Sequence, residues 1–311
     1  MTSGLKPTDE QNPRLHFDIY AILESSQELY LGHEVQVNVN VVETVKLTIY
    51  DQEQQRERAL EKCYISPTKR RGVERRCLIW APHKDGKLLG ETLDPICGIP
   101  ATCAKPDCPI CGPYGGLIAG KKTLIGRVTH GGGVAVQGLD PQEKQRAMHP
   151  SRLASPATGK DDTPVPFKRE YNQPGLLYPI TNHALSVTDK EFASVAYAFL
   201  DSLPRIGSGN PKGIALAEDP ATQMPLLVVD RYLVPRGKRP VISPSITDPQ
   251  KAIEDFTHAA NDVNTSDDAT EYVGTQPTFK AKHFARWVGQ NALHKLQEYS
   301  SNFVDTVLQA D

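Results

Sequence analysis

Four of the six cysteines in this 311-residue chain fall within the segment CGIPATCAKPDCPIC, residues 97–111. Cys97, Cys103, Cys108 and Cys111 have the spacing C-x5-C-x4-C-x2-C. Four thiolates satisfy a tetrahedral metal, and a C-x2-C turn presents two sulfurs together. If the four thiolates bind one metal, the segment has to fold so that its four sulfurs lie close to one another.

Because four sulfurs leave no open coordination position, we expect a structural Zn²⁺ ion rather than a catalytic one. An iron–sulfur cluster takes the same ligands, and cysteines packed as small apolar residues need no metal. The sequence leaves both alternatives open. Burial without metal fits Cys63 and Cys77 better, because CLIW at 77–80 is typical of a core strand.

The remaining composition indicates a soluble protein. No run of eighteen apolar residues is long enough for a membrane helix, and the start, MTSGLKPTDEQNPR, lacks the apolar core of a signal peptide. We therefore expect a cytoplasmic location, where reducing conditions favour metal ligation over disulfides. The formal net charge of −2 counts mildly against nucleic-acid binding, although the local distribution of charge decides.

Strands are expected at 14–23, 33–51, 168–187 and 224–235. Val35, Val37, Val39 and Val41 alternate with polar residues, as in a half-buried strand. The alternation shifts near Glu43, which indicates a bulge or a turn into a second strand. The polar, helix-favouring segment 52–62 is expected to be an exposed connection.

Helices are expected at 188–203, 248–262 and 280–308. Thr188 and Glu191 form a capping-box pattern, and the apolar residues that follow lie on one helical face. The polar segment 140–168 indicates a long loop or a protruding hairpin, and loops of that length are usually functional or mobile. Strands and helices mix without regular alternation, so the sequence predicts an α+β fold.

Several segments join basic residues to glycines or aromatics: KRRGVERR, YGGLIAGKK, RVTHGGG, FKREY and PRGKR. Arginine and lysine neutralise phosphates, glycines admit a close ligand, and rings stack on bases. A solvated face or a simple turn explains each segment alone about as well. The candidate RNA-binding residues are Lys69, Arg70, Arg71, Arg75, Arg76, Lys121, Lys122, Arg127, His130, Gly131, Gly132, Gly133, Lys168, Arg169, Tyr171, Arg236 and Lys238.

The chain carries none of the common motifs of catalysis. G-x-x-x-x-G-K-[ST], G-x-S-x-G and H-E-x-x-H do not occur, and the histidines are dispersed. We therefore expect no enzymatic activity, although a site assembled from distant residues stays open.

The order of these features resembles the backbone subunit of type I-D CRISPR interference complexes (Csc-type), within the repeat-associated mysterious protein (RAMP) superfamily. The resemblance is carried by FKREYNQPGLLYPITNHALSVTDKEFASVAYAFLDSLPRIGSGNPKG at 167–213, and by the cysteine cluster that runs into CGPYGG and a strand with Arg127. It covers roughly residues 60–240. Tyr114 stands where the family usually has a phenylalanine.

The resemblance implies a modified RRM-like (ferredoxin-like) palm, with a zinc-binding insertion and a thumb-like β-hairpin. The corresponding division is palm at 1–60, basic zinc-binding insertion at 61–123, palm strand and thumb at 124–187, and the rest of the palm at 188–311. Such subunits polymerise head to tail along CRISPR RNA and expose its bases to pair with target DNA. The implied partners are CRISPR RNA, target DNA through the guide, neighbouring copies and other subunits of the complex, without a membrane.

Two other functions remain open at this point. One is a metal-dependent ribonuclease of the same superfamily, although no aspartate stands in a convincing loop context. The other is a zinc-stabilised protein-interaction module, which would bind no RNA.

Overall fold

The computed structural model describes residues 13–31, 33–36, 39–51, 55–138, 142–148, 165–207, 213–263, 269–273, 276–281 and 283–309. Its largest sheet has the order β14-β15-β16-β13-β1-β11-β8, with β12 paired to one end of β1. All of these neighbours are antiparallel. The strands are β1 (Leu15–Glu24), β8 (Val128–Gly132), β11 (Leu177–Val187), β12 (Ala215–Leu216), β13 (Leu227–Tyr232), β14 (Ala269–Val273), β15 (Gln276–Ala281) and β16 (Phe284–Val288).

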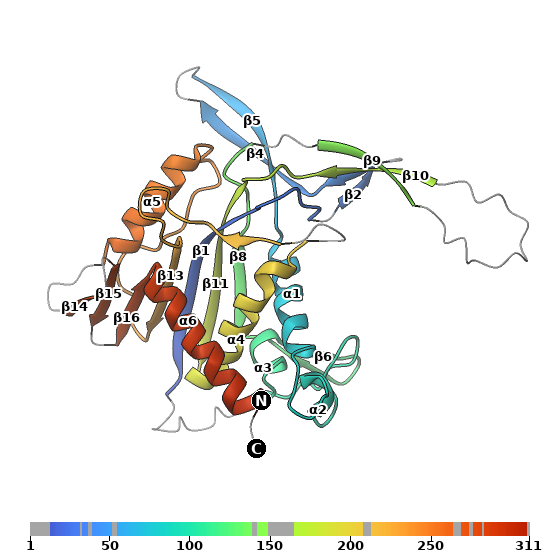
Figure 1. The fold of residues 1–311 in the computed structure, drawn as a ribbon, viewed down its shortest axis with the longest axis vertical. Coiled ribbons are helices and arrows are strands. Elements are labelled where there is room, and N and C mark those ends of the chain that lie inside the picture. The colour runs from blue at the N-terminus through green and yellow to red at the C-terminus, as the bar shows by residue number, and fades with distance from the viewer. Residues whose placement is uncertain are drawn as a thin grey trace, which may run out of the picture.

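The central strand β1 separates two cores, because successive side chains of a strand point to opposite faces. Phe17 and Ile19 belong to the larger core, whereas Tyr20 and Ile22 belong to the smaller one, which includes Phe256 of α5 (Pro249–Asn261). Helices α4 (Asp189–Ser202) and α6 (Gln290–Phe303) cover the larger core, followed by a π-helical turn, Val304–Leu308. Figure 1 shows α4 and α6 crossing the sheet on the same face.

Helix α4 forms where its sequence predicts it. Thr188 Oγ1 accepts a hydrogen bond from Glu191 N at 3.1 Å, and the Glu191 carboxylate accepts one from Thr188 N at 2.9 Å. The predicted apolar face is buried, and Phe192 stacks on Phe17 with ring centroids 4.0 Å apart. The helix ends at Ser202, before the 3-10 turn Leu203–Arg205 that contains Pro204.

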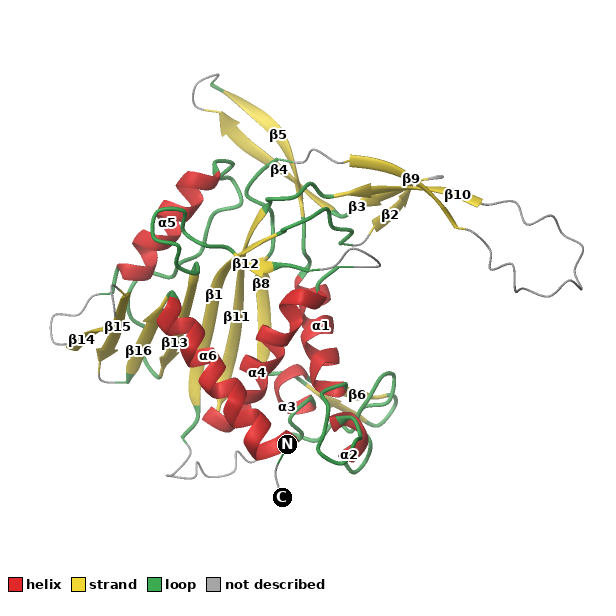
Figure 2. Cartoon of the chain, in the orientation of Figure 1, coloured by secondary structure: helices red, strands yellow, loops and turns green. Residues whose placement is uncertain are grey.

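Two smaller β-structures project from the upper part of the molecule (Figures 1 and 2). One sheet has the order β2-β3-β10-β9, from β2 (His33–Gln36), β3 (Val39–Val42), β10 (Val165–Tyr171) and β9 (Gln142–Met148). The other is the hairpin of β4 (Thr44–Asp51) and β5 (Arg56–Cys63). Strands β9 and β10 are antiparallel, so the described ends of segment 140–168 pair as a hairpin.

The cysteine segment lies at the opposite end, beside α1 (Pro67–Ile79) (Figure 1). The short helix α2 (Leu89–Thr92) precedes it, and the short helix α3 (Cys111–Tyr114) begins at its last cysteine. A small antiparallel pair follows, β6 (Gly116–Ile118) with β7 (Lys122–Leu124).

The structure corrects four expectations. Residues 33–42 form the hairpin β2–β3 rather than one strand, although the break near Glu43 is where β4 begins. Residues 56–63 form strand β5 rather than a connection, because pairing with β4 overrides their polar sequence. Residues 56–59 and Glu61 are exposed, as expected. Cys77–Ile79 are buried, as expected, but in helix α1. The region 280–308 holds two strand segments before α6, and Gly289, with φ of +58°, separates them from the helix.

The mixture of helices with largely antiparallel sheets agrees with the α+β class, although β3 and β10 pair in parallel. Within the described residues, no helix has both the length and the apolar character needed to span a membrane.

Candidate metal centre and nucleic-acid interface

The four clustered cysteines converge on one point. Each is buried, and their sulfurs all lie within 4.8 Å of one another. Cys111 Sγ lies 3.3 Å from Cys97 Sγ and 3.7 Å from Cys103 Sγ. A tetrahedral zinc with Zn–S bonds of about 2.3 Å places its sulfurs about 3.8 Å apart. The donor set and its spacing therefore fit a four-thiolate metal ion.

Backbone geometry holds this arrangement. Cys108 Sγ accepts hydrogen bonds from the amides of Ile110 and Cys111 at 3.4 and 3.3 Å. Such bonds stabilise a thiolate, the form that binds metal. Gly112 closes the turn, because a Cβ there would lie 2.6 Å from Pro106 O. A metal here would have four protein ligands and a structural role.

Helix α1 has one face turned toward the protein interior and another turned outward, because residues four apart lie on the same helical face. Its cap is Ser66, whose Oγ accepts from Lys69 N at 3.4 Å. Arg70 and Glu74 face inward and are each 2% exposed, whereas Arg71 is exposed and Arg75 half-buried. The five predicted RNA contacts on this helix, Lys69, Arg70, Arg71, Arg75 and Arg76, thus differ in access to solvent.

Arg70 is engaged inside the protein. It donates to Asn182 Oδ1 at 2.8 Å and to the carbonyls of Gly131 and Thr181 at 2.6 and 3.2 Å. Burial lowers its pKa to about 10, so it stays charged at neutral pH. The guanidinium ties α1 to strands β8 and β11.

Glu74 forms the second half of this buried network. Its carboxylate accepts from Tyr114 Oη at 2.9 Å and Asn182 Nδ2 at 3.0 Å, and lies 2.8 Å from His130 Nε2. Burial acts to raise the pKa of Glu74, but His130, Arg70 and the Asn182 hydrogen bond outweigh it, so the pKa is lowered. Sequence reasoning did not identify Glu74 or Asn182.

The outward side of α1 borders a groove of about 400 Å³. Tyr114 to Gly116, which we call the floor, and residues of the β6–β7 pair complete its lining. Arg71 donates through Nη2 to Tyr114 O. The lining residues are Thr68, Arg71, Gly72, Arg75, Tyr114, Gly115, Gly116, Leu117, Thr123 and Leu124, none of them acidic. Sequence reasoning had singled out only the two arginines among them.

Other predicted contacts lie around this groove or close to it. Lys121 and Lys122 are exposed where β6 turns into β7. Arg76 is half-buried at the end of α1. Lys69 forms an ion pair with Glu43. The groove and these side chains make up a surface that we call the α1 basic surface: Lys69, Arg71, Arg75, Arg76, Lys121 and Lys122.

The three glycines at 131–133 are explained by close packing of the backbone. Gly132 and Gly133 have φ of +72° and +90°, and a Cβ on them would lie 2.4 Å from Pro179 O and 2.2 Å from Ile65 O. A Cβ on Gly131 would lie 2.7 Å from Thr181 Oγ1. The His130 side chain is 1% exposed. These glycines let β8 pack closely against its neighbours. Gly133 is buried and Gly131 half-buried, whereas Gly132 is exposed.

The remaining predicted contacts are dispersed. Arg127 is paired with Glu191 at 2.7 Å, and Tyr171 is 1% exposed. Lys168 and Arg169 lie on β10, opposite Gln145 and Lys144 of β9. Arg236 and Lys238 lie in the loop after β13, where Lys238 N donates to Asp262 O at 2.8 Å. The structure does not bring these residues together with the α1 basic surface.

The sheet face opposite α4 and α6 carries a further polar cluster. Asp18 accepts from Tyr20 Oη at 2.8 Å and Tyr232 Oη at 3.0 Å, and lies 2.8 Å from His183 Nδ1. Beside it, Asp230 makes a two-pronged ion pair with the fully buried Arg286 at 2.7 Å. These groups are paired with one another and stabilise the sheet.

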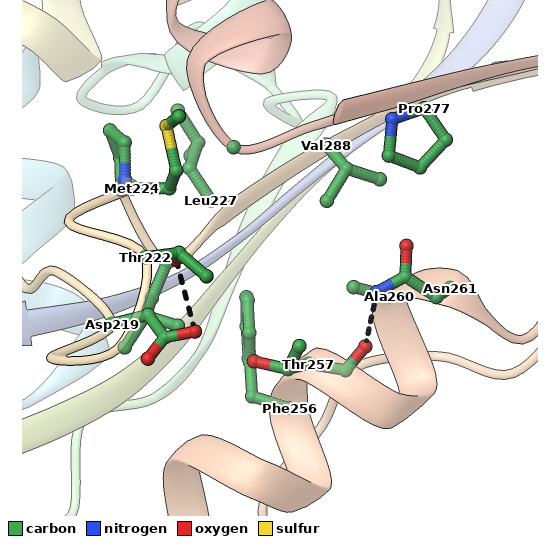
Figure 3. A pocket seen from close by; sticks show the side chains of 13 residues that line it. Asp219, Thr222, Met224, Leu227, Phe256, Thr257, Ala260, Asn261, Pro277 and Val288 are labelled. Atoms are coloured by element: carbon green, nitrogen blue, oxygen red, sulfur yellow. Dashed lines mark hydrogen bonds between the residues drawn. The ribbon is translucent and has the colours of Figure 1, made fainter. Parts of the chain in front are cut away.

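A separate pocket lies between α5, the loop before β13 and the end of β16 (Figure 3). Met224, Phe256 and Val288 give it an apolar lining. Three of its polar side chains, Asp219, Thr222 and Asn261, already have partners: Thr222 Oγ1 donates to Asp219 at 3.1 Å, and Asn261 Nδ2 donates to Thr257 O at 2.9 Å. The pocket lacks the positive charge that a nucleic acid requires.

No family model matches the chain, and no curated protein matches it. Among solved structures, the chain is similar to Csc2 of Thermofilum pendens, with a TM-score of 0.38 and 15% identity. The match covers 68% of this chain and 67% of that chain. The structural neighbour is thus of the Csc type named by the sequence resemblance. A similarity of this size transfers no residue role, ligand or partner to this chain.

Proposed function

We propose that this chain is a non-catalytic RNA-binding subunit of a type I-D CRISPR interference complex. The observation that carries the proposal is the α1 basic surface, whose arginines border a groove without an acidic lining residue. In a chain with a net charge of −2, such a segregation of positive charge is typical of a surface that binds phosphates.

The sequence resemblance supports the finer parts of the proposal. The large sheet with α4 and α6 would be the RRM-like palm, the cysteine segment the zinc-binding insertion, and the β9–β10 hairpin the thumb. Copies would polymerise head to tail along the CRISPR RNA in the cytoplasm. The protein would hold the sugar–phosphate backbone, while the exposed bases pair with target DNA and read its sequence.

The four cysteines would hold a structural Zn²⁺. Such an ion contributes folding free energy directly. The cysteines would thereby fix the segment that leads from Cys111 to the floor of the groove, and the ion itself would take no part in RNA chemistry.

Binding of several unrelated single-stranded RNAs, measured by fluorescence anisotropy over a series of salt concentrations, tests the proposal. We expect similar affinities for all RNAs and a linear fall of log K with log salt, because phosphate contacts release counterions. Absent binding at low salt would contradict the proposal. Magnesium-dependent cleavage of the RNA would instead favour the ribonuclease.

A further inference from the structure

The groove beside α1 has the chemistry of a phosphate site. Its lining includes two arginines of α1, Arg71 and Arg75, together with Thr68 of α1 and Thr123 of β7. An arginine donates two parallel hydrogen bonds to a phosphate, and a hydroxyl adds a third donor. The volume of about 400 Å³ is within the range of small-ligand sites.

Arg75 carries the sharpest signal. Its Nε and Nη2 atoms are buried and have no hydrogen-bond partner among the described residues. These two atoms form one edge of the guanidinium fork, the edge that grips an oxyanion with two bonds. Buried polar atoms without a partner are rare and costly. A ligand that drew this edge into the groove would remove the cost.

The positions of the groove walls follow from close backbone packing. Gly115 has φ of +79°, and a Cβ there would lie 2.8 Å from Leu124 O and 3.1 Å from Arg71 Nη2. A Cβ on Gly116 would lie 3.0 Å from Cys111 Sγ. The floor of the groove therefore packs closely against Cys111 Sγ of the cysteine cluster and against Arg71 of α1.

We infer that this groove is a discrete subsite for one phosphodiester of single-stranded RNA, with Arg75 as its principal ligand. Arg71 is held by its bond to Tyr114 O and supplies the second positive charge. The inference rests on the proposed function and deepens it. One phosphate would bind at a defined site beside α1, whereas the other lysines and arginines would attract RNA only through their charge.

The test compares Arg75→Ala, Arg75→Lys and Arg71→Ala with Lys251→Ala in the full-length, metal-loaded protein. Lys251 is an exposed lysine of α5, paired with Asp255. Its loss changes the net charge by the same amount as the loss of an arginine, but at a position away from the groove. The probe is fluorescein-labelled oligouridine, titrated at several salt concentrations. Urea unfolding of each variant shows whether it is folded.

We expect Arg75→Ala to weaken binding about tenfold or more, as for a lost hydrogen bond to a charged group. The salt slope should fall by about 0.7, the value for one phosphate contact on a single strand. Arg75→Lys should recover the slope but only part of the affinity, because lysine lacks the fork. Lys251→Ala should bind like the wild type.

Equal weakening by Arg75→Ala and Lys251→Ala in folded proteins would overturn the phosphate subsite and leave the RNA-binding proposal standing. Full recovery by Arg75→Lys would also overturn the subsite, since charge alone would then suffice. A wild-type protein that binds no oligouridine at low salt would overturn both.

Discussion

Tyr114 donates a hydrogen bond of 2.9 Å to Glu74 in the buried side of helix α1. Tyr114 ends the short helix that begins at the last clustered cysteine, Cys111, so this bond connects the cysteine segment to α1. The carbonyl of the same tyrosine accepts from Arg71 on the outward side. One residue thus joins the candidate metal centre, the buried network and the groove.

Replacing Tyr114 by phenylalanine should lower the free energy of unfolding by about 1–3 kcal/mol, because the buried Glu74 carboxylate loses one of its donors. Urea unfolding measures the loss. Tyr50→Phe is the matched control, since Tyr50 is 62% exposed on β4 and should change little. Equal stability of the two variants would show that the hydroxyl at 114 contributes nothing.

Cys108→Ser should reduce the metal content of the purified protein and destabilise it, because serine cannot replace a thiolate ligand and structural metal contributes folding free energy. Elemental analysis measures the first effect and thermal unfolding the second. Cys63→Ser should retain the metal, because Cys63 lies outside the cluster and bonds to Asn172 Oδ1 at 3.1 Å. Less than a tenth of a metal per wild-type chain would exclude a metal centre.

Loss of the metal should also weaken RNA binding, because the floor of the groove lies against Cys111 Sγ. Chelator treatment of the wild type, followed by oligouridine titration, tests this coupling. We expect the affinity to fall at least as far as in Arg75→Ala. An unchanged affinity after complete metal release would separate the cysteine cluster from the groove.

Asp18 should make stability depend on acid pH. Burial acts to raise the pKa of Asp18, but His183 and the hydrogen bonds from Tyr20 and Tyr232 lower it below its usual 3.8. A lowered folded-state pKa adds stability that is present above about pH 3.8 and is lost as pH falls through the folded value.

Asp18→Asn should therefore be less stable than the wild type at neutral pH, and the difference should shrink under acid conditions. Urea unfolding across this pH range measures both quantities. A constant difference at all pH values would mean that the charge of Asp18 adds no stability.

Lys62 should hold the loop of residues 241–246 against strand β5 of the β4–β5 hairpin. It is fully buried on β5, and its Nζ donates to Pro244 O at 2.7 Å and Ile246 O at 2.5 Å. Lys62→Met keeps the bulk but removes both bonds, so amides of residues 241–246 should exchange faster with deuterium. Lys46→Met, on the exposed side of β4, should leave that exchange unchanged. Identical exchange in both variants would contradict the role of Lys62.

Local signals allowed part of the fold to be predicted. The capping pair Thr188 and Glu191 defines the start of α4, and the branched and aromatic residues of β1 define a strand. By contrast, β5 has a polar sequence that indicates no strand, and only its partner β4 makes it one. Alternation of valines likewise cannot separate one strand from the hairpin β2–β3, since both have a period of two.

The candidate site shows the same limit. The four cysteines were identifiable from spacing, and the structure brings them together. The charge run KRRGVERR was also evident, but not its division, because that requires knowing that it is helical. Once the segment is known to be a helix, Arg70 and Glu74 fall on its inward face, and Arg71 and Arg75 fall on its outward face. Thr68 and Thr123 carried no sequence signal, because only tertiary packing places them in one groove.

The most direct measurement for the α1 basic surface is photo-crosslinking of 4-thiouridine-labelled RNA to the full-length protein, with the linked peptides mapped by mass spectrometry. We predict crosslinks within the segments 68–76 and 114–124, which contain the residues that line the groove, and their loss in Arg71→Ala combined with Arg75→Ala. Crosslinks concentrated on α5 and residues 219–225, without any near α1, would contradict it.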